Sequence, residues 1–194
     1  MFTGFGFLPF LLDTHFDVRG RLARLVPGQI QTKSDIAIGL DEPSCLYYNN
    51  GVGHVYGRKG VFITDTSKAT HTQKQYFTIN DVSISYLTSG DTYYFSNNTI
   101  VPSTQKHKIT ILQYKNHYDS NDILSSYECT TLLTRLVDQT PSFNIGRTKT
   151  PKGFPSQTPT FKLTFMKGPM TTGYYSTTEK LYTVDKALLA FTYE

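Results

Sequence analysis

The sequence predicts an all-β fold, and three observations predict it. Tyr and Phe are abundant, at 14 and 13 residues, beside many Thr residues, while Trp is absent. Thr, Tyr and Phe favour strands, whereas the helix-favouring residues Ala, Glu and Leu are, taken together, scarcer. Apolar and polar residues alternate in several short runs, and turn residues separate these runs at intervals of about 8–12 residues. We therefore expect an antiparallel sandwich of jelly-roll type.

Two runs show the alternation most clearly. In residues 160–165 apolar and polar side chains alternate strictly, which is the two-residue period of a strand with one buried face. In residues 75–87 the apolar phase changes between Ile79 and Val82. A shift of one residue turns every following side chain to the other face, so this strand requires a bulge or bend at that point.

Turn residues place further strands. Asn50 and Gly51 form an Asn-Gly pair, which supplies the positive φ angles of a tight hairpin between 46–48 and 54–56. Another strand is expected over 108–114. One short helix is expected near 121–137, where apolar residues recur at intervals of three to four.

The chain has the size of one β domain, with 194 residues. We expect a single sandwich over 13–194, preceded by an apolar docking segment over 1–12. That segment is shorter than the roughly 20 apolar residues that cross a bilayer, and it lacks the basic lead of a signal peptide. We therefore expect no membrane span. The proline-rich loop 145–159 is expected to be exposed and to lie at a contact.

The charge and the cysteine content exclude few classes of protein. The net charge is +4, and acidic residues interrupt the basic ones, so a nucleic-acid interface is only weakly indicated. Cys45 and Cys129 could form one disulfide or remain two thiols, and the redox compartment stays open.

Motifs for catalysis, cofactors and metals are missing. The glycine-rich stretch 51–60 matches neither a dinucleotide loop nor a P-loop, and no serine-hydrolase elbow occurs. The five histidines form no zinc-type pair, and there is no C-x-x-C. A Cys45–His54 pair has the order of some cysteine proteases, but Cys45 leads into a strand, where a buried thiol is expected. We therefore expect no catalytic, cofactor-binding or metal-binding residues.

Six residues are candidates for binding. Three arginines could contact phosphate or another polyanion, although a solvated face is the favoured explanation for them. Tyrosines occur in adjacent pairs, so one member of each pair faces outward in a strand, where its large amphipathic ring suits an interface or a sugar site. The candidates are Arg19, Arg21, Arg24, Tyr48, Tyr94 and Tyr175.

In general character, a β domain rich in Thr, Tyr and Asn with an apolar N-terminal segment resembles viral or phage structural proteins. The resemblance implies a non-enzymatic virion component, either a minor capsid subunit or a host-attachment head. It would act by homo-oligomer formation or by binding other virion proteins, at a virion or extracellular location. The alternatives are a lectin-like module that binds a glycan receptor, and an enzyme whose site is assembled from scattered residues.

Overall fold

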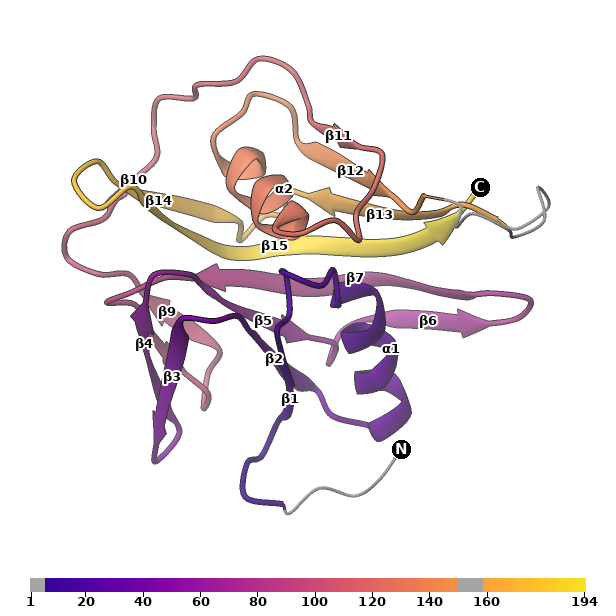
Figure 1. The fold of residues 1–194 in the computed structure, drawn as a ribbon, viewed down its shortest axis with the longest axis horizontal. Helices are drawn as coiled ribbons and strands as arrows, with labels where there is room; N and C mark the ends of the chain where they lie inside the picture. The colour runs from indigo at the N-terminus through magenta and orange to yellow at the C-terminus, as the bar shows by residue number, and fades with distance from the viewer. Residues whose placement is uncertain (1–5, 150–158) are drawn as a thin grey trace.

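The computed structural model of this protein describes residues 6–149 and 159–194. Strands make up 46% and helices 12% of it, which confirms a mostly β fold. Figure 1 shows the first half of the chain, in indigo to magenta, below the C-terminal half, in orange to yellow. The two halves meet where strand β7 (Phe77–Leu87) pairs with strand β15 (Leu181–Tyr193).

A mixed sheet of 11 strands runs through both halves. Two of its pairs, β1–β2 and β11–β12, are parallel, and the other pairs are antiparallel. Its path is β1 (Leu11–Thr14), β2 (Ile36–Leu40), β5 (Val61–Asp65), β7, β15, β13 (Phe161–Met166), β12 (Phe143–Arg147) and β11 (Asp119–Ser120), with β6 (Thr70–Gln73), β10 (His107–Lys108) and β14 (Thr172–Ser176) beside it.

A second sheet of four antiparallel strands packs on the first half of the large sheet. Its order is β3 (Ser44–Asn49), β4 (Val52–Gly57), β8 (Thr92–Tyr94) and β9 (Thr99–Val101). The expected antiparallel, jelly-roll-like sandwich is not confirmed, because the large sheet contains parallel pairs. A parallel pair needs a long crossover, and helix α1 (Leu22–Thr32) provides it between β1 and β2.

The core lies on both faces of the large sheet because neighbouring residues of a strand point to opposite sides. In β2, Ala37 belongs to the cluster that packs against α1 and against helix α2 (Glu128–Val137). The next residue, Ile38, belongs to the cluster beneath the small sheet. The helices therefore cover one face, and the small sheet covers part of the other.

Two local predictions are confirmed. The Asn50–Gly51 hairpin joins β3 to β4, with φ angles of 47° and 79°. The bulge in β7 lies where the apolar phase changes, since Val82 pairs with Leu189 whereas Ile79 pairs with Phe191. Asp81 takes up the extra residue with a φ of 60°.

Three expectations need correction. The strand over 108–114 ends at Lys108, and Ile111 is 85% exposed, so the apolar alternation there does not mark a buried face. The helix expected from residue 121 begins at Glu128, because Tyr127 is left-handed, with a φ of 62°. The loop expected over 145–159 begins later, because its first residues belong to β12; residues 150–158 lie outside the described part.

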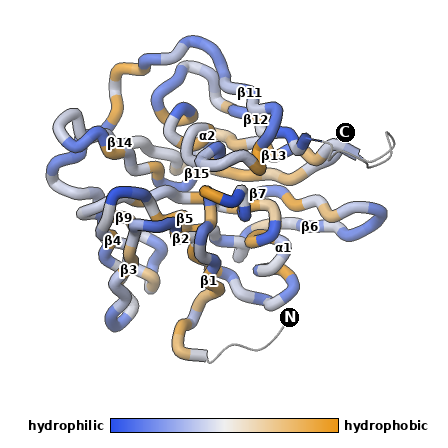
Figure 2. The backbone as a smooth tube through the Cα atoms, in the orientation of Figure 1, coloured by the Kyte–Doolittle hydropathy of each residue, from blue (hydrophilic) through white to orange (hydrophobic). Residues whose placement is uncertain are grey.

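The apolar N-terminal segment stands out ahead of β1 in Figure 2. Residues 1–5 lie outside the described part. Phe10 is buried against the small sheet, and its ring stacks on Phe95 with 5.0 Å between the centroids. Within 6–149 and 159–194, no helix is long and apolar enough to cross a membrane. Cys45 and Cys129 are both free thiols, the first exposed and the second buried.

Candidate active site

The candidate site lies where the parallel strands β1 and β2 end. Parallel strands bring their carboxyl ends to the same edge of a sheet, and in open α/β sheets this edge is where ligands bind. Thr14, the last residue of β1, lies opposite Leu40, the last residue of β2. The backbone N–H of Phe16 donates to the Leu40 carbonyl at 3.0 Å. The residues that follow each strand therefore meet.

His15 and Glu42 form the centre of the site. Nδ1 of His15 lies 3.6 Å from Oε1 of Glu42, and the two side chains are 37% and 83% exposed. The backbone of His15 is left-handed, with a φ of 50°, a conformation that costs free energy in a residue other than glycine. Such strain collects at functional sites. A histidine with a carboxylate at one ring nitrogen is the arrangement of a general base with its orienting partner.

Two arginines stand beside this pair. Asp13, at the buried face of β1, accepts hydrogen bonds from Nη1 of Arg21 at 3.0 Å and from Nε of Arg24 at 2.9 Å. The hydrogen bond to Asp13 raises the pKa of the Arg24 guanidinium, so this group stays positively charged. Cations at the start of a helix are unfavourable, because the N–H groups there are already positive, and Asp13 offsets that repulsion.

Two further carboxylates, those of Asp41 and Asp17, hold the loop that carries His15 through hydrogen bonds. Asp41 accepts the backbone N–H groups of Asp17 at 2.8 Å and of Val18 at 3.2 Å. Asp17 in turn accepts the N–H groups of Cys129 at 3.1 Å and of Thr130 at 2.9 Å. The residue before helix α2 gives it no side-chain cap. Asp17, which precedes Thr130 by 113 positions, instead accepts hydrogen bonds from the first N–H groups of the helix. The loop geometry therefore depends on both halves of the chain.

Burial dominates the ionisation of Asp17. It raises the pKa to about 6, against the hydrogen bonds from Thr130 and Cys129, which lower it, and with a smaller contribution from the charge of Asp41. Burial, together with the charges of Asp17 and Asp41, raises the pKa of the Cys129 thiol, which favours its less reactive protonated form.

The structure brings two of the six predicted binding residues together. Arg21 and Arg24 share Asp13, whereas Arg19 is exposed and has no ion-pair partner within residues 6–149 and 159–194. The tyrosines lie elsewhere. Tyr48 packs edge-on against Phe10 and Phe95, and Tyr94 is 39% exposed on β8. Tyr175 lies against Tyr182, with 4.4 Å between the ring centroids.

Sequence reasoning missed His15 and Glu42 as a pair. They lie far apart in the sequence and meet only through the parallel β1–β2 pairing. A signal was present, since an apolar run ends before Asp13, a helical apolar spacing follows, and a second apolar run ends before Asp41. That order is the β–α–β pattern, whose strands end at one edge. No group of three or more potential metal ligands occurs in the described part of the chain.

No family model matches this sequence. Curated proteins nevertheless match part of it. A cyanophycinase from Trichormus variabilis is 28% identical over 114 residues, which cover 55% of this chain and 38% of the relative. A cyanophycinase from Synechococcus elongatus is 32% identical over 99 residues, which cover 47% of this chain and 31% of the relative.

This chain is similar to cyanophycinases. It spans well under half the length of the relatives that it matches. The similarity contradicts the leading expectation from the sequence, a non-enzymatic virion or capsid protein that acts by self-association, because these relatives are named as enzymes. That expectation is wrong for a physical reason: strand-rich composition indicates a fold class, and a fold class does not fix a function.

Proposed function

We propose that this chain supplies the acid–base part of the active site of a peptidase-type enzyme that degrades cyanophycin. The similarity to cyanophycinases supports the reaction class. The observation that carries the proposal is the His15–Glu42 pair at the carboxyl ends of β1 and β2.

In the proposed mechanism the His15 imidazole takes a proton from the nucleophile as it attacks the scissile carbonyl, and then gives that proton to the leaving amine. Glu42 orients the ring and stabilises the imidazolium that forms in between. No described hydroxyl or thiol is hydrogen-bonded to His15. We therefore propose that the nucleophile lies outside the described residues 6–149 and 159–194.

The arginines are proposed to hold the substrate. Asp13 fixes the guanidinium groups of Arg21 and Arg24 next to the His15 loop, and Arg19 is free to reach an anionic group. Arginine binds carboxylates through two parallel N–H donors, which gives orientation as well as affinity. Because Arg24 already uses two such donors on Asp13, Arg19 is the side chain proposed to bind an anionic group in this way. Anionic groups of the substrate would thus be held at a fixed distance from the reacting carbonyl.

A chimera tests the proposal. The matched segment of Trichormus variabilis cyanophycinase would be replaced by this chain, so that His15, Glu42 and His54 are all present, and release of soluble product from cyanophycin would be measured. We expect an active chimera in which His15→Gln lowers kcat by about 10²–10⁴-fold, the usual contribution of a positioned acid–base group. His54→Gln is the matched control, because His54 lies on β4 and hydrogen-bonds to Thr92.

Two outcomes would overturn the proposal. One is a folded chimera, with the circular dichroism and melting temperature of the parent, that leaves cyanophycin intact. The other is an active chimera in which His15→Gln and His54→Gln have equal kcat values.

A further inference from the structure

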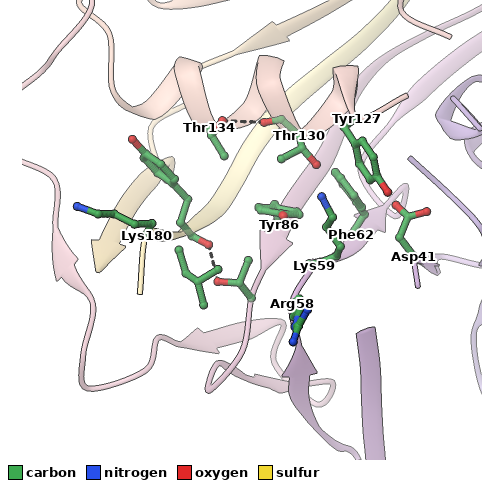
Figure 3. Close-up of a pocket in the computed structure, with 13 residues that line it drawn as sticks. Asp41, Arg58, Lys59, Phe62, Tyr86, Tyr127, Thr130, Thr134 and Lys180 are labelled. Carbon is green, nitrogen blue, oxygen red and sulfur yellow. Dashed lines mark hydrogen bonds between the residues drawn. The ribbon is translucent and has the colours of Figure 1, made fainter. Parts of the chain in front are cut away.

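A cavity of about 240 Å³ lies between helix α2 and the segment that leads into β5. Its walls come from both halves of the chain, with Lys59 and Tyr86 on one side and Tyr127 and Thr134 on the other (Figure 3). None of His15, Glu42 or the three arginines of the candidate active site lines it. A water molecule takes about 30 Å³ of liquid, so the space suits a ligand of about eight to ten non-hydrogen atoms.

The charge of this cavity is unbalanced. Arg58, Lys59 and Lys180 line it, and none of them has an ion-pair partner in the described part of the chain. The one carboxylate in the lining is Asp41, and its two oxygens already accept N–H groups of the His15 loop. An excess of positive charge in a recess with low-dielectric walls attracts an anion.

Lys59 is the central cation. It is half-buried, and its Nζ lies 3.9 Å from the centroid of the Tyr127 ring. Figure 3 shows this side chain extending past Tyr86 and Phe62 toward α2, with Arg58 on the side away from the helix. The Lys180 amine points away from the rings, so Lys180 belongs to the rim.

The walls around Lys59 are aromatic. The Tyr86 ring packs on Gly60 so closely that a Cβ there would lie 2.1 Å from a ring atom. Any larger residue at 60 would displace this ring, which lines the cavity. Flat apolar walls around a cation suit a ligand with an anionic head and a planar or apolar body.

We propose that this cavity is a binding site for a small organic acid, whose carboxylate pairs with Lys59 and Arg58 while its body packs against Tyr86 and Tyr127. Asp41 and α2 also hold the His15 loop, so an occupant would touch the elements that position the candidate active site. The proposal rests on the cavity alone and stands whether or not His15 is catalytic.

Thermal unfolding of the purified protein tests this site with sodium benzoate as the probe, against sodium chloride at equal ionic strength. We expect a saturable rise in Tm of about 3–6 °C when benzoate reaches about ten times its Kd. Lys59→Gln and Arg58→Gln should each raise the Kd by about tenfold or more, because each removes a charge-assisted hydrogen bond. Lys74→Gln, an exposed lysine outside the cavity, should leave the Kd unchanged.

A second variant tests whether binding requires the space of the cavity as well as its positive charge. Thr134→Met keeps every cation and fills the space, so it should also abolish the shift, with circular dichroism confirming its fold. The proposal is overturned if benzoate gives no saturable shift, or if Lys59→Gln responds like Lys74→Gln. An equal, Lys59-dependent shift with inorganic phosphate would overturn the organic-acid class, since phosphate has no body to pack on the rings.

Discussion

Single residues in this protein act across long distances in the sequence. Asp17 lies in the loop after β1, yet it satisfies the N–H groups that open α2. Local patterns cannot predict such a cap, because they describe only neighbours in the chain. Arg19, Arg21 and Arg24, by contrast, were visible as candidates in the sequence, although Asp13, the partner that Arg21 and Arg24 share, was not.

The raised pKa of Asp17 predicts a pH dependence of stability. An acid whose pKa rises from about 4 in the unfolded chain to about 6 in the folded protein binds more protons when folded. Its contribution to stability is therefore complete below pH 4 and is lost as the pH rises through 6. The shift corresponds to about 3 kcal/mol. Asp17→Asn should show a smaller fall in the free energy of unfolding between pH 4 and 7 than the wild type, by about that amount.

Urea unfolding at a series of pH values measures this difference. Asp81→Asn serves as the control, because Asp81 is exposed. If the free energy of unfolding of Asp17→Asn changes with pH as it does in the wild type, the role given to Asp17 is contradicted.

A buried ion pair gives a second prediction at the residue scale. Nζ of Lys106 lies 2.7 Å from Oδ1 of Asp91, and both side chains are 0% exposed. Burial lowers the pKa of Lys106, and Asp91 acts against that change. Lys106→Met leaves a buried carboxylate without its cation, so we expect a loss of about 3–5 kcal/mol in the free energy of unfolding at pH 7. Lys74→Met, at an exposed position, should change it by less than about 0.5 kcal/mol, and similar values for both variants would contradict the assignment.

Elements were predictable where their signals were local. The Asn50–Gly51 hairpin and the bulge in β7 follow from turn chemistry and from the two-residue period. Helix α1 was missed because it contains Pro27 and Gly28, which weaken helical preference, and has no side-chain cap. The parallel pairing that builds the candidate active site was missed with it.

The bulge itself can be tested at Asp81. This residue has a φ of 60°, where glycine costs nothing and a β-branched residue is strained. We expect Asp81→Gly to be neutral within about 0.5 kcal/mol, and Asp81→Ile to lower the free energy of unfolding by about 1–2 kcal/mol. Chemical denaturation of both variants measures their free energies of unfolding. An Asp81→Ile variant as stable as Asp81→Gly would show that residue 81 does not have a left-handed backbone conformation.

On the scale of the whole molecule, one apolar cluster joins the two halves. It includes Ile84 of β7 and Leu189 of β15, and both helices contribute to it. We therefore expect the chain to unfold in one cooperative transition. Leu189 is 0% exposed, so Leu189→Ala should lower the free energy of unfolding by about 2–5 kcal/mol, whereas Val101→Ala, at a 49% exposed position, should not.

Far-ultraviolet circular dichroism and tyrosine fluorescence follow this transition independently, since the chain has 14 tyrosines and no tryptophan. The two curves should coincide in the wild type and in Leu189→Ala. Two separate transitions would show that the halves are independent domains.

The central claim is that the ends of β1 and β2 place His15 and Glu42 together as one catalytic unit. A double-mutant cycle on kcat/KM for cyanophycin, measured in the chimera, tests it most directly. Residues that act as a unit are strongly non-additive, so His15→Ala with Glu42→Ala should be no slower than His15→Ala alone. If the losses of the two single variants multiply in the double variant, His15 and Glu42 act independently and the proposed pair does not exist.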